Sequence, residues 1–105
     1  MKRFTINLLA LPLILSANLA LAAGDAAAGK TKSITCAACH GANGISVNEL
    51  WPNLAGQKAA YMVKQIKAVR DGERDNPVML PMVKSLSDQD IEDLAAYYAG
   101  LSACN

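Results

Sequence analysis

Two segments of the chain carry apolar side chains at the three- and four-residue spacing of an amphipathic helix. The first predicts a helix over Lys58 to Asp71, stopped by Gly72. Its apolar stripe consists of Ala59, Met62, Val63, Ile66 and Val69. The second pattern is the stronger and predicts a helix opening at Ser87, with Asp90 three residues on as a capping-box variant. Its apolar face consists of Ile91, Leu94, Ala95, Tyr98 and Leu101.

A further helix is predicted near the start of this region, from Asp25 to about Ile34. Asp25 is a favourable N-cap, and three alanines with high helix propensity follow it. No strand-like alternation occurs after Ala22, so the fold class is all-α. The segments 41–56 and 73–85 are rich in Gly, Asn and Pro and are too long for simple turns between helices. Loops of this length need something to pack against.

The first 22 residues have the pattern of an export signal. Lys2 and Arg3 form a basic start, an apolar stretch follows over residues 8–15, and Ala20-Leu21-Ala22 is a small-x-small cleavage pattern. We predict cleavage after Ala22, which leaves a domain over residues 23–105. The alternative is an uncleaved membrane anchor, but polar residues and Pro12 interrupt the run, which is shorter than the roughly 20 apolar residues needed to span a bilayer.

Charge and size narrow the class of protein. The full chain has 105 residues and a net charge of +1, and removing 22 residues leaves 83 with eight basic and nine acidic side chains. This near-neutral balance gives no indication of nucleic-acid binding or of strong electrostatic steering. A domain this small buries little apolar surface, so it usually requires a disulfide framework, a metal or a large prosthetic group.

The cysteines disfavour a disulfide framework. There are three, so they cannot all pair within the chain, and Cys36 and Cys39 are too close together to close a useful loop. Cys104 lies next to the C-terminus. In an oxidising compartment it is either an exposed free thiol in a monomer, which we expect, or the link of a disulfide dimer.

Cys36-Ala37-Ala38-Cys39-His40 is the C-x-x-C-H motif of covalent haem attachment. On a helix these residues share a face, so both thiols can reach one porphyrin edge while the imidazole points at the iron. A zinc site is a poor alternative, because Cys104 would be the only further soft ligand. A thioredoxin-like redox pair would need a preceding strand, which the sequence does not predict.

The sequence resembles the class I c-type cytochromes, in particular small bacterial periplasmic proteins with one haem and the halves of tandem di-haem carriers. The resemblance spans the predicted mature chain and rests on the following stretches: GDAAAG at 24–29, CAACHG at 36–41, WPNLAGQ at 51–57, NPVM at 76–79 and LSDQDI at 86–91, continuing through Tyr98. It implies a small cytochrome c-like fold of three to five helices wrapped around one covalently bound haem c.

The resemblance also implies roles for residues outside the motif. Such proteins take a methionine as second axial ligand, eight residues before the serine that caps the last helix, which corresponds to Met79; Met82 would then pack against the haem, although it remains the alternative ligand. Pro52 would accept the imidazole N–H of His40 through its carbonyl, and Leu54 would pack on the haem.

One further implied role is structural. Gly29 would let the first helix cross the last one beside Tyr97 or Tyr98.

Iron held by both His40 and Met79 has no vacant position for a substrate, which favours a carrier over an enzyme. We therefore expect a soluble periplasmic one-electron carrier. It would dock transiently with redox proteins at the haem edge, and would meet membranes only through membrane-bound redox complexes. Two alternatives stay open: a haem-based ligand binder or weak peroxidase with a labile methionine ligand, and an electron-transfer subunit of a larger oxidoreductase.

Overall fold

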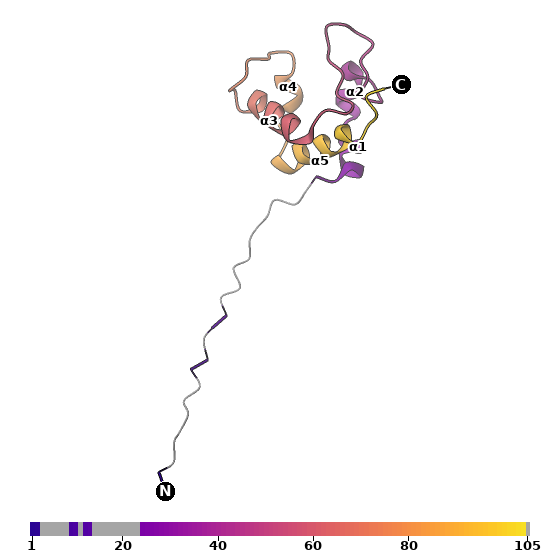
Figure 1. Cartoon of the computed structure of the whole chain (residues 1–105). Helices are drawn as coiled ribbons and strands as arrows, with labels where there is room; N and C mark the ends of the chain where they lie inside the picture. Colours follow the sequence, from indigo (N-terminus) through magenta and orange to yellow (C-terminus); the bar gives the residue numbers. More distant parts are fainter. Residues whose placement is uncertain (3–8, 11, 14–23, 105) are drawn as a thin grey trace.

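Five helices make up the regular structure of the described part of the chain (Figure 1). The computed structural model describes residues 1–2, 9–10, 12–13 and 24–104, and no strand occurs among them. The helices are α1 (Ala26–Lys32), α2 (Ile34–His40), α3 (Ala59–Arg70), α4 (Leu80–Val83) and α5 (Asp88–Ala99). The predicted all-α class is confirmed.

The predicted export signal falls almost entirely outside the residues that the structure describes. In the described part of the chain, none of the helices has the length and apolar content needed to cross a membrane.

The helix predicted from Asp25 to about Ile34 is α1, which ends at Lys32, and Ile34 is already the first residue of a second helix, α2. Asp25 caps α1 as expected, accepting from the backbone N–H groups of Ala27 (2.9 Å) and Ala28 (3.3 Å). The division falls at Ser33, whose hydroxyl donates to the carbonyl of Lys30 (2.7 Å). A serine hydroxyl that bonds back to the preceding turn competes with the backbone ladder and bends a helix. The second helix, α2, carries the C-x-x-C-H motif.

Both periodic segments form helices, as predicted. Helix α3 begins one residue after the start of the predicted range, Lys58 to Asp71, and ends one residue before its end. Gly72 follows α3 with a φ of 79°, a left-handed conformation that favours glycine. Ser87 is the N-cap of α5 and forms a full capping box with Asp90. Both predictions rested on local signals, and both are confirmed.

The segment 73–85, predicted as a loop, contains the short helix α4. Its four residues are too few to show a helical period, which explains why the pattern missed it. Pro81 lies in the first turn, where no backbone N–H is required. Val83 is buried and fastens the helix to the body of the domain.

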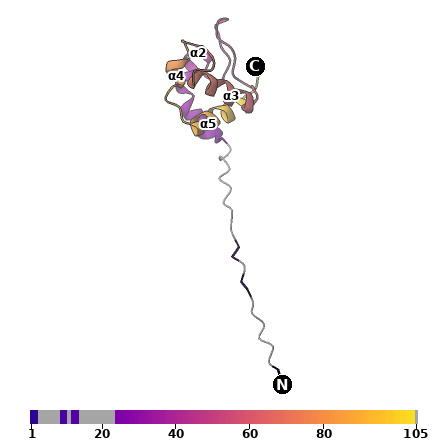
Figure 2. The same ribbon diagram turned by 90° about the vertical axis from the view of Figure 1, so that its left-hand side faces the viewer.

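The crossing of α1 and α5 brings two backbones into direct contact (Figures 1 and 2). A Cβ atom at Gly29 would lie 2.0 Å from the carbonyl oxygen of Asp93 and 2.8 Å from the Cβ of Tyr97. No side chain fits at position 29 without moving α1 away from α5. The predicted close approach beside Tyr97 is therefore confirmed.

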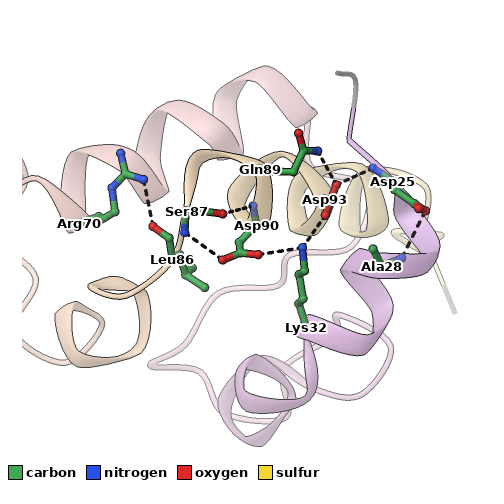
Figure 3. Close-up of polar contacts among 9 residues, drawn as sticks. All are labelled: Asp25, Ala28, Lys32, Arg70, Leu86, Ser87, Gln89, Asp90 and Asp93. Carbon is green, nitrogen blue, oxygen red and sulfur yellow. Dashed lines mark hydrogen bonds and ion pairs between the residues drawn. The ribbon is translucent and has the colours of Figure 1, made fainter. Parts of the chain in front are cut away.

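A buried carboxylate fastens the same crossing (Figure 3). Asp93 is only 3% exposed and accepts three hydrogen bonds, from the backbone N–H of Asp25 (2.8 Å), Nζ of Lys32 (2.6 Å) and Nε2 of Gln89 (2.9 Å). Lys32 also pairs with Asp90 at 2.8 Å. The N–H of Asp25, followed by Lys32 and Gln89, lowers the pKa of Asp93 to about 2. Both ends of α1 are thus tied to α5.

The apolar face of α5 forms the core. Met62 of α3 packs with Leu94, Ala95 and Tyr98 of α5. Where the end of α3 meets the start of α5, Arg70 donates to the carbonyl of Leu86 (3.1 Å) and pairs with Asp88 (2.8 Å). Partly buried apolar side chains surround this core, namely Cys36, Leu54, Ala59, Val63, Ile66, Leu86, Tyr97 and Leu101.

Replacement of Asp93 tests the buried network. Because the pKa of Asp93 is lower in the folded state than its ordinary value of 3.8, its carboxylate stabilises the fold above about pH 4, and this contribution is lost as the pH falls toward 2. Asp93→Asn is expected to lower the free energy of unfolding at pH 7 and to flatten its fall between about pH 4 and pH 2. Denaturant titrations of the holoprotein across this range measure both effects.

The matched control is Glu92→Gln, the neighbouring position on the same helix, which should leave the pH profile close to that of the wild type. A profile of Asp93→Asn that falls as steeply with acid as the wild type would contradict the assigned role.

Candidate functional site

A pocket of about 610 Å³ opens between α2, α3, α4, α5 and the two long loops. All six residues that the sequence predicted as site residues line it: Cys36, Cys39, His40, Pro52, Leu54 and Met79. Met82, the alternative ligand, lines it as well. Residues separated by more than 40 positions along the chain therefore meet at one cavity.

The helix α2 turns its motif toward this pocket. Cys36, Cys39 and His40 all line it, as the spacing i, i+3, i+4 requires of residues on one helix face. Both cysteines are free thiols of intermediate exposure. Burial raises the pKa of the Cys36 thiol, so this thiol is held protonated and apolar until it reacts.

His40 is held in one orientation. Its side chain is buried, with 6% exposed, and Nδ1 lies 2.8 Å from the carbonyl oxygen of Pro52. A carbonyl oxygen only accepts hydrogen bonds, so Nδ1 carries the proton and donates it. The lone pair of Nε2 is then available to a metal.

The loop before α4 is also fixed by hydrogen bonds. The backbone N–H groups of Glu73 and Arg74 both donate to the carbonyl of Ala68 (2.8 and 2.9 Å), which closes the end of α3. Further along, the Asn76 side chain accepts from the N–H of Met79 (3.1 Å) and begins the turn into α4.

The two methionines differ in exposure. Met82 is 51% exposed, whereas Met79 is partly buried at the entrance to α4. In Figure 1, α4 and the loop that precedes it lie across the domain from α2. A ligand from this loop therefore approaches the pocket from the side opposite the C-x-x-C-H helix.

Tyr98 provides a test of whether the pocket fits a cofactor. Its ring is 2% exposed, its hydroxyl has no hydrogen-bond partner among the described residues, and burial raises its pKa above the ordinary value. Because a buried hydroxyl without a partner is costly, the orphaned group is consistent with a bound group that completes this wall. The rest of the lining is mostly apolar, including Leu54, Val83 and Leu94. Two thiols, an imidazole nitrogen and a thioether within such walls fit haem c.

The same residues are a poor fit to a bare metal ion. Within the described ranges, no three His, Cys, Asp or Glu side chains are grouped so that they could hold one. Cys104, the remaining soft ligand considered for zinc, is exposed and does not line the pocket.

Tyr98, Arg74 and Gln65 are among the pocket residues that were not identified from the sequence as site residues. Tyr98 was assigned to the apolar face of its helix, and nothing in the sequence marked its hydroxyl. Arg74 and Gln65 also line the pocket, and they are joined by a hydrogen bond of 3.1 Å from Nη1 to Oε1. Both look like solvated polar positions in the sequence, and only the folded loop brings them together.

Comparison with known proteins agrees with this geometry. A family model for cytochrome c matches residues 22–102. The chain is 52% identical over 80 residues to cytochrome c-554(548) of Halomonas halodenitrificans, covering 73% of this chain and 96% of that protein. It is 51% identical over 81 residues to cytochrome c4 of Pseudomonas aeruginosa, covering 77% of this chain and 40% of that protein.

Solved structures show the same fold. The crystal structure of reduced cytochrome c4 from Pseudomonas stutzeri matches with a TM-score of 0.73 and 40% identity, over 76% of this chain and 47% of that chain. Cytochrome c4 from Acidithiobacillus ferrooxidans matches with a TM-score of 0.70 and 28% identity, over 79% and 53%. The chain thus spans nearly all of the Halomonas protein and about half of the cytochromes c4. From the family match over most of its length, this chain belongs to the cytochrome c family, whose domain binds haem c covalently.

Proposed function

We propose that this chain is a periplasmic one-electron carrier in which haem c is attached to Cys36 and Cys39 and ligated by His40 and Met79. One observation carries the proposal: a single apolar pocket gathers two thiols, an imidazole with a free Nε2 and a methionine from the opposite side. The cytochrome c4 relatives support electron transfer as the activity. Haem c, when bound, supplies a one-electron couple.

The protein side chains set how that couple behaves. The Pro52 carbonyl fixes the ring of His40 and raises the basicity of its Nε2. A neutral, soft thioether from Met79 favours the reduced iron, and the apolar lining, including Leu54, acts in the same direction. With both axial positions filled by protein, no position remains for a substrate, which supports a carrier over an enzyme.

Redox proteins are the proposed partners, docking weakly at the exposed haem edge so that exchange stays fast. A second candidate role is that of an electron-transfer subunit. It is favoured by 38% identity over 72 residues to a thiosulfate dehydrogenase electron acceptor of Stutzerimonas stutzeri, of which the chain covers 33%. A thiosulfate dehydrogenase structure from Marichromatium purpuratum matches with a TM-score of 0.68 and 34% identity, over 19% of that chain. Co-purification with a stable partner would favour this role.

Haem retention and closed ligation test the carrier function. Protein matured in a host with haem-attachment machinery is expected to keep its pigment in acidified acetone, because thioether bonds survive this treatment. The reduced protein should not bind carbon monoxide readily, because both axial positions are occupied. Ready binding of carbon monoxide would instead support the ligand binder or weak peroxidase.

Separate substitutions decide between the two methionines. Met79→Ala is expected to abolish the weak red absorption band of ferric iron bonded to thioether sulfur, and to open the reduced iron to carbon monoxide. Met82→Ala, the matched control in the same segment, should retain the band. The reverse result would assign the ligand to Met82.

The exposed thiol of Cys104 gives a test of oligomeric state. For the proposed monomer, non-reducing and reducing gels should show the same single band, and Cys104→Ser should change neither. A band of twice the mass that disappears on reduction and in Cys104→Ser would instead establish a disulfide dimer.

A further inference from the structure

Arg74 is the only ionised side chain of the Asp, Glu, Lys and Arg types that lines the pocket in the described part of the chain. It comes from the loop between α3 and α4, which in Figure 1 lies across the domain from α2. Four further polar side chains on the pocket wall are neutral amides, namely Asn53, Gln57, Gln65 and Asn76. A single fixed cation at the wall of an apolar cavity indicates an anionic group on the ligand.

The guanidinium of Arg74 is positioned but not neutralised. Its Nη1 donates to Oε1 of Gln65 (3.1 Å), and its backbone N–H is tied to the carbonyl of Ala68 (2.9 Å). No ion pair to Arg74 occurs among the described residues, and its acidic neighbours in sequence, Glu73 and Asp75, are exposed and do not line the pocket.

Arg70, the last residue of α3 and four positions earlier in the sequence, differs from Arg74 in its partners. Its guanidinium pairs with Asp71 and Asp88 at 2.8 Å each and donates a hydrogen bond to the carbonyl of Leu86. Arg70 therefore has a structural partner for its charge, whereas Arg74 presents its charge to the cavity.

Haem c carries two propionate carboxylates, on the porphyrin edge opposite the two thioether bonds. Attachment at α2 holds the thioether edge, so the carboxylates belong at the far side of the pocket. We propose that Arg74, held by Gln65, binds a haem propionate and thereby sets the reduction potential and its pH dependence. This inference rests on the proposed function. A guanidinium matches a carboxylate with two parallel N–H donors, which a lysine cannot do.

The direction of the electrostatic effect follows from the charges. An ionised propionate stabilises ferric iron, and pairing with Arg74 offsets part of this negative charge, so the potential is raised. The cation also favours the ionised carboxylate, so it lowers the pKa of the propionate. Arg74 is an exposed residue, so screening by solvent and salt keeps both effects moderate.

Few other groups in the pocket could make the reduction potential depend on pH. The remaining titratable side chains that line it are Cys36, Cys39, His40, Tyr61 and Tyr98. In the holoprotein the first two would be thioethers and the third an iron ligand, and burial raises the pKa of Tyr98 further above its ordinary value of 10. Nearby lysines such as Lys64 do not line the pocket.

The test measures the midpoint potential of the holoprotein from pH 5 to pH 9 by spectroelectrochemistry. Arg74→Gln is expected to lower the equilibrium constant for reduction by about threefold at pH 7, the scale of one charge at ~10 Å in a partly screened site. The pH-dependent part of the potential should also move to higher pH. Arg74→Lys should recover at least half of both changes, and Gln65→Ala should give smaller changes in the same direction.

Lys64→Gln is the matched control, because it removes one positive charge from exposed α3 surface without touching the pocket. A potential and pH profile of Arg74→Gln equal to those of Lys64→Gln, with a normal thioether band, would overturn this inference and leave the proposed function intact. Should Arg74→Gln fail to mature, the comparison of Gln65→Ala with Lys64→Gln decides by the same criteria. Wild-type protein without covalent haem would overturn the proposed function and this inference with it.

Discussion

The backbone of α1 rests directly on the backbone of α5 where Gly29 meets the carbonyl of Asp93, and the position of the whole site depends on this contact. Only glycine permits such an approach. Since α2 follows α1 after a single residue, the seating of α1 fixes where the C-x-x-C-H motif points. The same helix α5 packs against α3 on another side, so one element aligns both walls of the pocket.

Polar groups inside this small domain are nearly all used to fix geometry. The buried carboxylate of Asp93 is tolerated because three donors surround it, one from the N-cap of α1 and one from its last residue. The imidazole of His40 is oriented by one carbonyl from the long loop that precedes α3. The exception is the hydroxyl of Tyr98, which has no partner among the described residues and lies on the pocket wall. The buried side-chain group that lacks a hydrogen-bond partner in the described residues therefore lies where a cofactor would bind.

The site combines an apolar interior, ligands from two sides and one cation on its wall. The first two features favour a couple that changes oxidation state without binding a reactant, as expected of a carrier. The third feature, Arg74 with Gln65, would give the loop that carries Met79 a second role. Hydrogen bonds hold this loop near both ends: the N–H of Arg74 donates to the carbonyl of Ala68, and the N–H of Met79 donates to the side chain of Asn76. Ligation and control of the potential would then be properties of one loop.

The sequence by itself determined the parts of this protein that depend on short-range order. Helical periodicity and capping defined α3 and α5 almost to the residue, and the C-x-x-C-H spacing placed Cys36, Cys39 and His40 on one helix face, which lines the pocket. The break at Ser33, the short helix α4 and the pocket contacts of Arg74 required the folded chain. So did the burial of Asp93, whose partners Asp25 and Lys32 lie 68 and 61 residues away. Local patterns record what a segment prefers, whereas contacts between distant residues exist only after packing has brought them together, so the tertiary structure alone decided them.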